Sequence, residues 1–230
     1  MERDDRIIAA VNTHQVLTAE LVCATLGMEG THSNLNIVER RLRLLAEENK
    51  RVKHFRQVRQ DGVTYSVSLS LSLRVNGARA QLLHRRMQSR FWVTLLAALP
   101  VENRKTDREF RTEKGPLVPD GYFTVKNDAF FVEVNTGRDS FDHPLQKARE
   151  YNRQQEYLCK IYNRESFHVL WVNRYAERRT AMLRRFAEIG KGDLFFVTSE
   201  DQFTPFDPHT ILDCWWSANS SEKVRLMEED

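Results

Sequence analysis

Residues 117–137 read Leu-Val-Pro-Asp-Gly-Tyr-Phe-Thr-Val-Lys-Asn-Asp-Ala-Phe-Phe-Val-Glu-Val-Asn-Thr-Gly. β-Branched and aromatic residues dominate segments 117–126 and 129–134, so both are predicted as strands, with a tight turn at 126–128. Asp120 lies near the start of the first strand and Glu133 near the end of the second. Antiparallel pairing across the turn therefore brings the two carboxylates close together.

A helix follows this hairpin. The run from Pro144 to about Tyr157 has helical spacing and places Lys147 in its first turn. Two neighbouring carboxylates need a cation, and Lys147 of this adjacent helix can reach back to the strand ends. Tyr151, one turn later, could orient Lys147 or could belong to the core.

These residues carry a resemblance. Pro119-Asp120 followed by Glu133-Val134-Asn135 resembles the bipartite motif of the PD-(D/E)XK nuclease superfamily. The longer pattern through Lys147 and Tyr151 is similar to the replication-relaxation family of plasmid and phage proteins. The sequence departs from both at Asn135, where the superfamily has Lys and the replication-relaxation pattern usually has Asp. The resemblance implies a winged helix followed by a nuclease-like domain, over about residues 5–200.

The same resemblance implies a chemistry. Asp120 and Glu133 would be metal ligands for Mg²⁺ or Mn²⁺, which prefer oxygen donors, and the metal would supply a hydroxide-like nucleophile. Asp120, Glu133 and Lys147 would then be the catalytic residues, with Lys147 supplying the positive charge that Asn135 cannot. The plainer alternative makes Asp120 part of an ordinary turn, Glu133 a strand-end residue and Lys147 a surface charge.

Apolar spacing in the N-terminal part predicts three helices, of which the third spans residues 33–49. Leu35, Val38, Leu42 and Leu45 fall on one face of this helix, which leaves Ser33, Asn36, Arg40 and Arg43 on the solvent face. Segments 52–60 and 63–68 are predicted strands joined by the favoured hairpin turn Asp61-Gly62.

Three helices followed by a basic hairpin are the parts of a winged helix-turn-helix. In such a module the third helix enters the major groove of DNA, and the hairpin contacts phosphates. The residues predicted to bind DNA are Ser33, Asn36, Arg40, Arg43, Lys53, Arg56 and Arg59. The alternative is that these charges only solvate a surface.

The whole chain is expected to be α/β, with an N-terminal winged helix-turn-helix and a restriction-endonuclease-like α/β domain built on a mixed sheet. Strands at 107–112, 167–172 and 194–198, together with the hairpin, alternate with helices at 78–99, 144–157 and 177–189, which favours this class. The predicted domains are residues 1–75, residues 76–218 and a polar C-terminal tail, 219–230.

Composition bounds the class of protein. The chain has 230 residues, of which 41% are hydrophobic and 29% charged, so wholesale disorder is not expected. Its net charge is only +3, but residues 51–60 contain several cations and no acid. The three cysteines lack the spacing of a zinc site or a disulfide framework, and no segment suggests a signal peptide or a membrane span. We expect a cytoplasmic protein.

Together with the DNA-binding features of the N-terminal part, the resemblance implies a DNA-binding protein of a plasmid, phage or other mobile element, with metal-dependent endonuclease or nicking activity in DNA replication or relaxation. A noncatalytic DNA-binding regulator or replication accessory with a nuclease-like fold is the alternative. Double-stranded DNA is the expected partner and no membrane partner is expected. Formation of a homodimer stays open.

Overall fold

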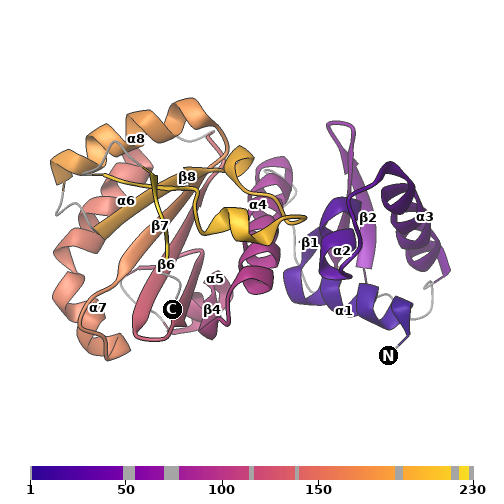
Figure 1. Ribbon diagram of the computed structural model, residues 1–230, viewed down its shortest axis with the longest axis horizontal. Helices are drawn as coiled ribbons and strands as arrows, with labels where there is room; N and C mark the ends of the chain where they lie inside the picture. The colour runs from indigo at the N-terminus through magenta and orange to yellow at the C-terminus, as the bar shows by residue number, and fades with distance from the viewer. Residues whose placement is uncertain are drawn as a thin grey trace. The chain divides into compact units, whose positions relative to one another are not determined.

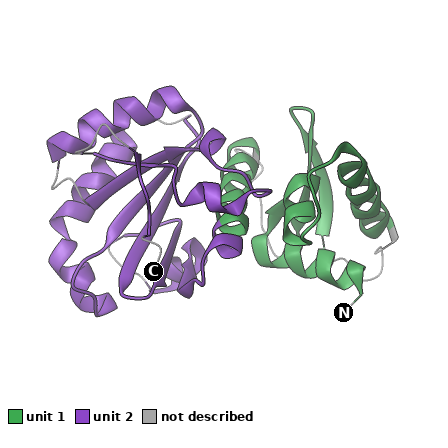
Figure 2. Ribbon diagram, viewed as in Figure 1, with its two compact units in different colours: residues 1–94 green, residues 95–230 purple. Residues whose placement is uncertain are grey.

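The computed structural model describes residues 2–48, 55–69, 78–113, 117–137, 140–189, 194–218 and 223–227. The protein is mixed α/β, as predicted. It divides into two compact units, residues 1–94 and 95–230, which are described separately (Figure 2). Among the described residues, no helix has both the length and the apolar character that crossing a membrane requires.

The described part of the first unit contains three complete helices, most of a fourth helix and a small sheet (Figure 1). The complete helices are α1 (Arg3–His14), α2 (Ala19–Thr25) and α3 (His32–Glu48), and the strands are β1 (Val16–Leu17), β2 (Phe55–Gln60) and β3 (Val63–Ser68). The strands pair antiparallel in the order β1-β3-β2. The predicted turn joins β2 to β3, and both Asp61 and Gly62 have positive φ angles, 53° and 79°, as a type I′ turn requires.

The predicted apolar face of α3 forms the core of this unit. Val38, Leu42 and Leu45 are buried in a cluster with side chains of α1 and α2. Thr18 caps α2, because its Oγ1 accepts a hydrogen bond from the Leu21 amide at 3.5 Å. Helix α4 (Ala78–Ala98) begins in this unit, where Leu82 packs against Val16, Tyr65 and Val67. The predicted domain boundary at residue 75 lies outside the described residues.

The second unit is built on a seven-stranded mixed sheet in the order β10-β9-β8-β7-β6-β5-β4. The strands are β4 (Glu102–Thr106), β5 (Gly121–Val125), β6 (Asp128–Asn135), β7 (His168–Asn173), β8 (Phe195–Ser199), β9 (Trp215–Ser217) and β10 (Lys223–Val224). The β6–β7 and β7–β8 pairs are parallel and the remaining pairs are antiparallel. At the β4 edge the pairing is interrupted by an irregularity between Glu102 and Lys105. Strand β10 lies within the segment predicted as a polar tail.

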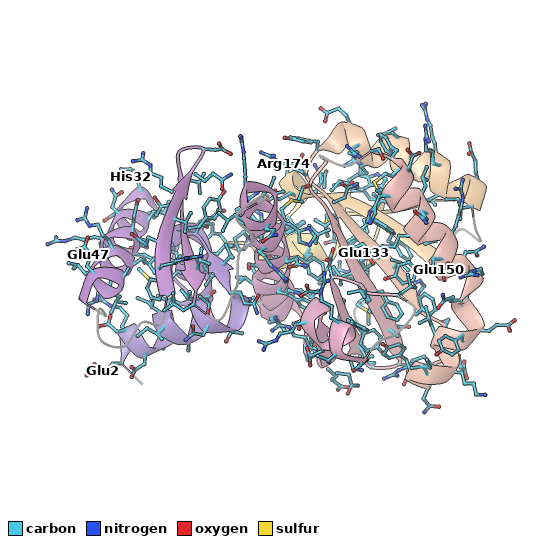
Figure 3. The ribbon with its side chains drawn as sticks, turned by 180° about the vertical axis from the view of Figure 1, so that it is seen from behind. Glu2, His32, Glu47, Glu133, Glu150 and Arg174 are labelled. Atoms are coloured by element: carbon cyan, nitrogen blue, oxygen red, sulfur yellow. The ribbon has the colours of Figure 1, made fainter. Side chains whose placement is uncertain are left out.

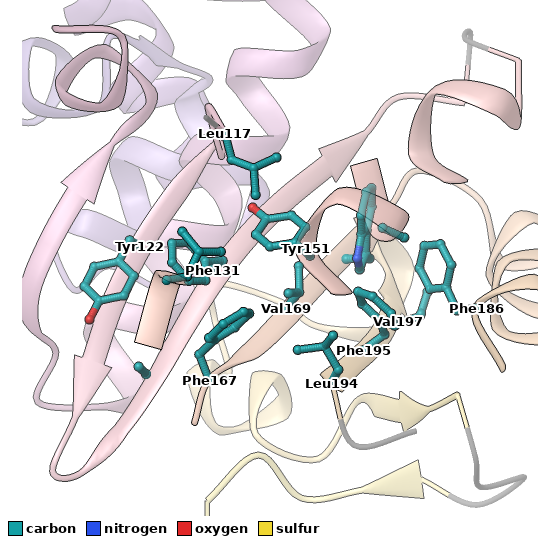
Figure 4. Packing of buried hydrophobic residues seen from close by; sticks show 14 of the residues in the cluster. Leu117, Tyr122, Phe131, Tyr151, Phe167, Val169, Phe186, Leu194, Phe195 and Val197 are labelled. Carbon is teal, nitrogen blue, oxygen red and sulfur yellow. The ribbon is translucent and has the colours of Figure 1, made fainter. Parts of the chain in front are cut away.

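Helices pack on one face of this sheet. They are α5 (Asp107–Glu113), α6 (Asp142–Arg153), α7 (Gln155–Tyr162) and α8 (Ala176–Ile189), and two short 3₁₀ helices, η2 (Glu200–Gln202) and η3 (Pro208–Ile211), follow β8. One buried cluster contains residues of all four α-helices and of the sheet. Figure 4 shows the aromatic centre of this cluster, where Phe131 of β6 lies beside Tyr151 and Phe167.

The prediction of a strand at 107–112 was wrong, because α5 occupies this segment. The Thr106 amide and hydroxyl both donate to Glu109 Oε2, at 2.7 and 2.9 Å. This is half of a capping box, in which a residue three positions into the helix satisfies the backbone of the N-cap. The strand lies one segment earlier, at β4. The single helix predicted over 144–157 is divided at Gln154 into α6 and α7.

Candidate functional site

The hairpin brings Asp120 and Glu133 together, as its spacing predicted. The Asp120 amide donates to the Val132 carbonyl at 3.0 Å, and the Val134 amide donates to Asp120 Oδ2 at 2.8 Å. Asp120 is thus held against the β6 backbone on both sides of Glu133. The Glu133 side chain is buried, with an exposed fraction of 3%, and lies inside the second unit (Figure 3).

Helix α6 supplies the two hydrogen-bond donors that hold Glu133. Lys147 Nζ lies 2.5 Å from Glu133 Oε2 and also donates to the Val118 carbonyl at 2.9 Å. The Tyr151 hydroxyl donates to Glu133 Oε1 at 2.6 Å. Lys147 and Tyr151 are four residues apart, so they project from the same face of the helix. Each Glu133 oxygen therefore has one donor, and Tyr151 bonds Glu133 rather than Lys147.

Burial and charge set the protonation of this cluster. Burial raises the pKa of Glu133 to about 7; the Lys147 ammonium opposes this rise and the Asp120 carboxylate adds to it. Burial alone would lower the pKa of Lys147, but the carboxylates of Glu133 and Asp120 outweigh burial and raise it. Burial and the Glu133 carboxylate also raise the pKa of Tyr151. At neutral pH, Lys147 is therefore an ammonium, Tyr151 is a neutral donor and Glu133 is close to the midpoint of its titration.

Asn135, where the resemblance to the nuclease motif would place a Lys, has contacts of its own. Its Oδ1 accepts a hydrogen bond from the Gly137 amide at 2.9 Å, and its Nδ2 lies 3.6 Å from the Met182 sulfur. Asn135 is buried and uncharged. It stabilises the turn after β6, and Lys147 is the ammonium that contacts Glu133.

The donor chemistry of the pair fits a hard divalent cation. Carboxylate oxygens are the ligands that Mg²⁺ prefers, and Mg²⁺ is commonly held by one or two carboxylates together with water and phosphate oxygens. Within the described residues, no cluster of three or more His, Cys, Asp or Glu side chains is placed to hold a metal ion. Asp120 and Glu133 would therefore hold an ion as a two-carboxylate site, in competition with the Lys147 ammonium for Glu133 Oε2.

In the first unit, six of the seven residues predicted to bind DNA are solvent-exposed. Ser33, Asn36, Arg40 and Arg43 are exposed on α3, and Arg56 and Arg59 are exposed on β2. The remaining residue, Lys53, lies outside the described residues. Arg41, on the same helix, is not part of this face, because it forms an ion pair with Asp4 of α1.

The sequence reasoning missed the Val118 carbonyl as a partner of Lys147, because a backbone acceptor leaves no signal in residue type. It also missed an interaction just beyond β6, where Arg178 Nη1 donates to the Gly137 carbonyl at 2.6 Å. The Gly137 φ angle of +78° marks a tight turn there, which its glycine residue type signals.

No known protein-family model and no curated protein matches the chain.

Proposed function

We propose that the protein binds double-stranded DNA through its first unit and cleaves or nicks a phosphodiester bond at Asp120, Glu133 and Lys147. The observation that carries this proposal is the contact of Lys147 Nζ with Glu133 Oε2, at 2.5 Å, beside Asp120. It places an ammonium next to two carboxylates, although the sequence has Asn135 where the nuclease motif has its Lys.

The arrangement of the first unit supports DNA binding. Three helices and a three-stranded antiparallel sheet are the components of a winged helix-turn-helix. The polar face of α3 is exposed and could enter a major groove, where Asn36, Arg40 and Arg43 would meet base edges. Arg56 and Arg59 on the β2–β3 hairpin would then meet phosphates.

At the site, each residue has a distinct role in this proposal. When bound, Mg²⁺ or Mn²⁺ lowers the pKa of a coordinated water and stabilises charge on the phosphate. Asp120 and Glu133 would hold the ion. Lys147 neutralises Glu133 in the free protein and would face the charge that develops on the phosphate during cleavage. Tyr151 orients Glu133 from the side opposite Lys147. With no exposed surface, Tyr151 does not suit the role of a nucleophile on DNA.

A noncatalytic DNA-binding regulator is the second candidate, favoured by the burial of Glu133. Both of its oxygens already accept hydrogen bonds, from Lys147 and Tyr151. In this reading the ion pair stabilises the fold, and the second unit has no chemistry of its own. A plasmid, phage or other mobile element is the expected source for either candidate, and a homodimer is compatible with both.

A supercoiled plasmid distinguishes the two candidates. With Mg²⁺ or Mn²⁺, the wild-type protein should convert it to open-circular or linear DNA, whereas Asp120→Ala and Lys147→Ala should not, because they remove a metal ligand or the ammonium. Binding of the same DNA should be retained in both variants. A metal should also raise the melting temperature of wild type, since an ion at 100 times its Kd stabilises a folded protein by about 2.7 kcal/mol. Stabilisation without cleavage would favour the regulator, and no response to metal would contradict a metal site.

Salt dependence tests the role of the first unit. Arg56→Ala/Arg59→Ala should weaken binding to all duplex sequences and reduce the slope of log K against log salt by about two, because each lost phosphate contact contributes roughly 0.9. Asn36→Ala should instead relax sequence preference. Arg108→Ala, which removes an exposed cation of α5, is the control. Equal slopes in wild type and the double variant would exclude the hairpin as a phosphate contact.

A further inference from the structure

Cationic side chains stack on aromatic rings around the first half of α8. The Arg174 guanidinium carbon lies 4.9 Å from the ring centroid of Tyr175, that of Arg178 lies 4.4 Å from Phe141, and that of Arg179 lies 3.7 Å from Trp216. Two more cations lie near two of these rings, Arg185 near Phe141 and Lys223 near Trp216. The set, here called the α8 strip, comprises Phe141, Arg174, Tyr175, Arg178, Arg179, Arg185, Trp216 and Lys223.

The α8 strip crosses the sheet near the carboxyl ends of the parallel strands. At one end, Arg178 Nη1 donates a hydrogen bond to the carbonyl of Gly137, the second residue after the end of β6. A Cβ added to Gly137 would lie 3.1 Å from Tyr175 Cδ2, so the Tyr175 ring packs closely on this turn. At the other end, Arg179 reaches Ser199 Oγ of β8 at 3.5 Å and stacks on Trp216 of β9.

The contacts at its two ends show how far the strip extends across the sheet and where it lies relative to Glu133. The strands from β6 to β9 are neighbours, and three inter-strand spacings of about 4.8 Å amount to roughly 14 Å. Arg174 directly follows β7, the strand that pairs with β6, and Glu133 lies near the end of β6 (Figure 3). A polymer lying along the strip would therefore pass the same end of the sheet that holds Glu133.

Three cations of the strip, Arg174, Arg179 and Arg185, form no ion pair with another described residue. Helix α8 has four arginines and two glutamates, so its own charge is positive. Tyr175 is also partly accessible, with an exposed fraction of 46%. The strip thus offers positive charge beside a partly exposed aromatic side chain.

From these contacts we infer that the α8 strip binds single-stranded nucleic acid. Proteins that hold unpaired strands combine cations that follow the phosphates with aromatic or guanidinium planes on which bases stack. In a duplex the bases already stack on one another, so rings such as Tyr175 would have no free base to contact. The inference goes beyond duplex binding by the first unit, and it requires no cleavage by the second.

Fluorescence anisotropy with a labelled oligothymidylate of about twelve nucleotides tests this inference. The measurement uses the full chain carrying Arg56→Ala/Arg59→Ala, which removes the proposed hairpin contacts, in EDTA without metal. Adding Arg174→Ala/Arg179→Ala should weaken binding at least tenfold. It should also reduce the salt slope by about 1.4, because each phosphate contact on a single strand contributes roughly 0.7. Tyr175→Ala should weaken binding, and Tyr175→Phe, which keeps the ring, should not.

The matched control is Arg153→Ala/Tyr157→Ala. It removes an exposed cation and an exposed ring from α6 and α7, away from the strip, and should leave binding unchanged. Melting curves of every variant exclude unfolding as the cause of a loss, and Arg174→Gln/Arg179→Gln replaces the alanine pair should that pair unfold. If the strip variants and the control bind the oligothymidylate equally well, the inference is overturned. Tighter binding of a duplex of the same length than of the single strand, lost in the strip variants, would also overturn it. If the strip variants lose single-strand binding and the wild-type protein never cleaves DNA, the strip is supported and the proposed nuclease activity is rejected.

Discussion

Removing the Glu133 charge should change how stability depends on pH. The pKa of Glu133 rises from 4.5 to about 7 on folding, so the folded protein binds this proton more tightly than the unfolded chain does. Its contribution to the free energy of unfolding therefore falls as pH rises from about 4.5 to about 7. At roughly 1.4 kcal/mol per pKa unit, the complete loss is about 3 kcal/mol. Glu133→Gln has no such proton and should lack this fall.

Urea unfolding at fixed pH values, in EDTA, measures the difference. Trp171 lies opposite Glu133 in the β6–β7 register, so its fluorescence reports on this part of the sheet. The unfolding free energy of Glu133→Gln minus that of wild type should rise by up to about 3 kcal/mol from pH 4.5 to pH 8. Lys147→Met should show the opposite change, a steeper fall than wild type, because the ammonium that opposes the rise in the Glu133 pKa is gone.

The double variant Glu133→Gln/Lys147→Met is the control, since it carries neither charge. Its dependence on pH should resemble that of Glu133→Gln, and the cycle of four proteins separates the ion pair from the individual side chains. Parallel curves for wild type and Glu133→Gln over this range would refute the reasoning, because they would mean that folding leaves the Glu133 proton affinity unchanged.

Three further substitutions test local features by thermal melting. Asn135→Lys should destabilise the protein by about 2–4 kcal/mol, since it buries a charge and removes the hydrogen bond to the turn after β6; an unchanged melting temperature would show that the position tolerates the motif's Lys. Thr106→Ala should cost about 1 kcal/mol through the N-terminus of α5, whereas Thr106→Ser should be nearly neutral. Gly137→Ala should cost at least about 1 kcal/mol, because its φ is +78° and the added Cβ would lie 3.1 Å from Tyr175 Cδ2, so the ring would have to shift.

Local patterns predicted the elements whose residues carry a strong signal. The apolar period of α3 correctly separated buried Val38 and Leu42 from exposed Asn36 and Arg40. The Asp61-Gly62 turn was equally reliable, because positive φ angles favour these residue types. Strand β1 was not predictable in this way. It has only two residues, too few to show an alternation of apolar and polar side chains, and it forms a strand only by pairing with β3.

For the candidate site, the sequence predicted which residues lie close together but not their contacts or their burial. Hairpin register follows from turn position, so the proximity of Asp120 and Glu133 could be inferred before the structure. The distances of 2.5 and 2.6 Å from Glu133 to Lys147 and Tyr151 could not, because they depend on how α6 packs against the sheet. The burial of Glu133, which raises its pKa, likewise comes from residues far apart in the chain.

The β4 edge of the large sheet has a consequence for self-association. An outermost strand with free backbone groups can recruit a strand from another molecule and begin aggregation. Here β4 carries the charged sequence Glu-Asn-Arg-Lys-Thr and an irregular register, and Asn103 has a φ of 47°, which disrupts a regular row of donors and acceptors. At the opposite edge, β10 has only two described residues, too few to template a long ladder. Extension of this sheet from copy to copy through the β4 edge is therefore disfavoured, so a self-association of the chain would favour other surfaces.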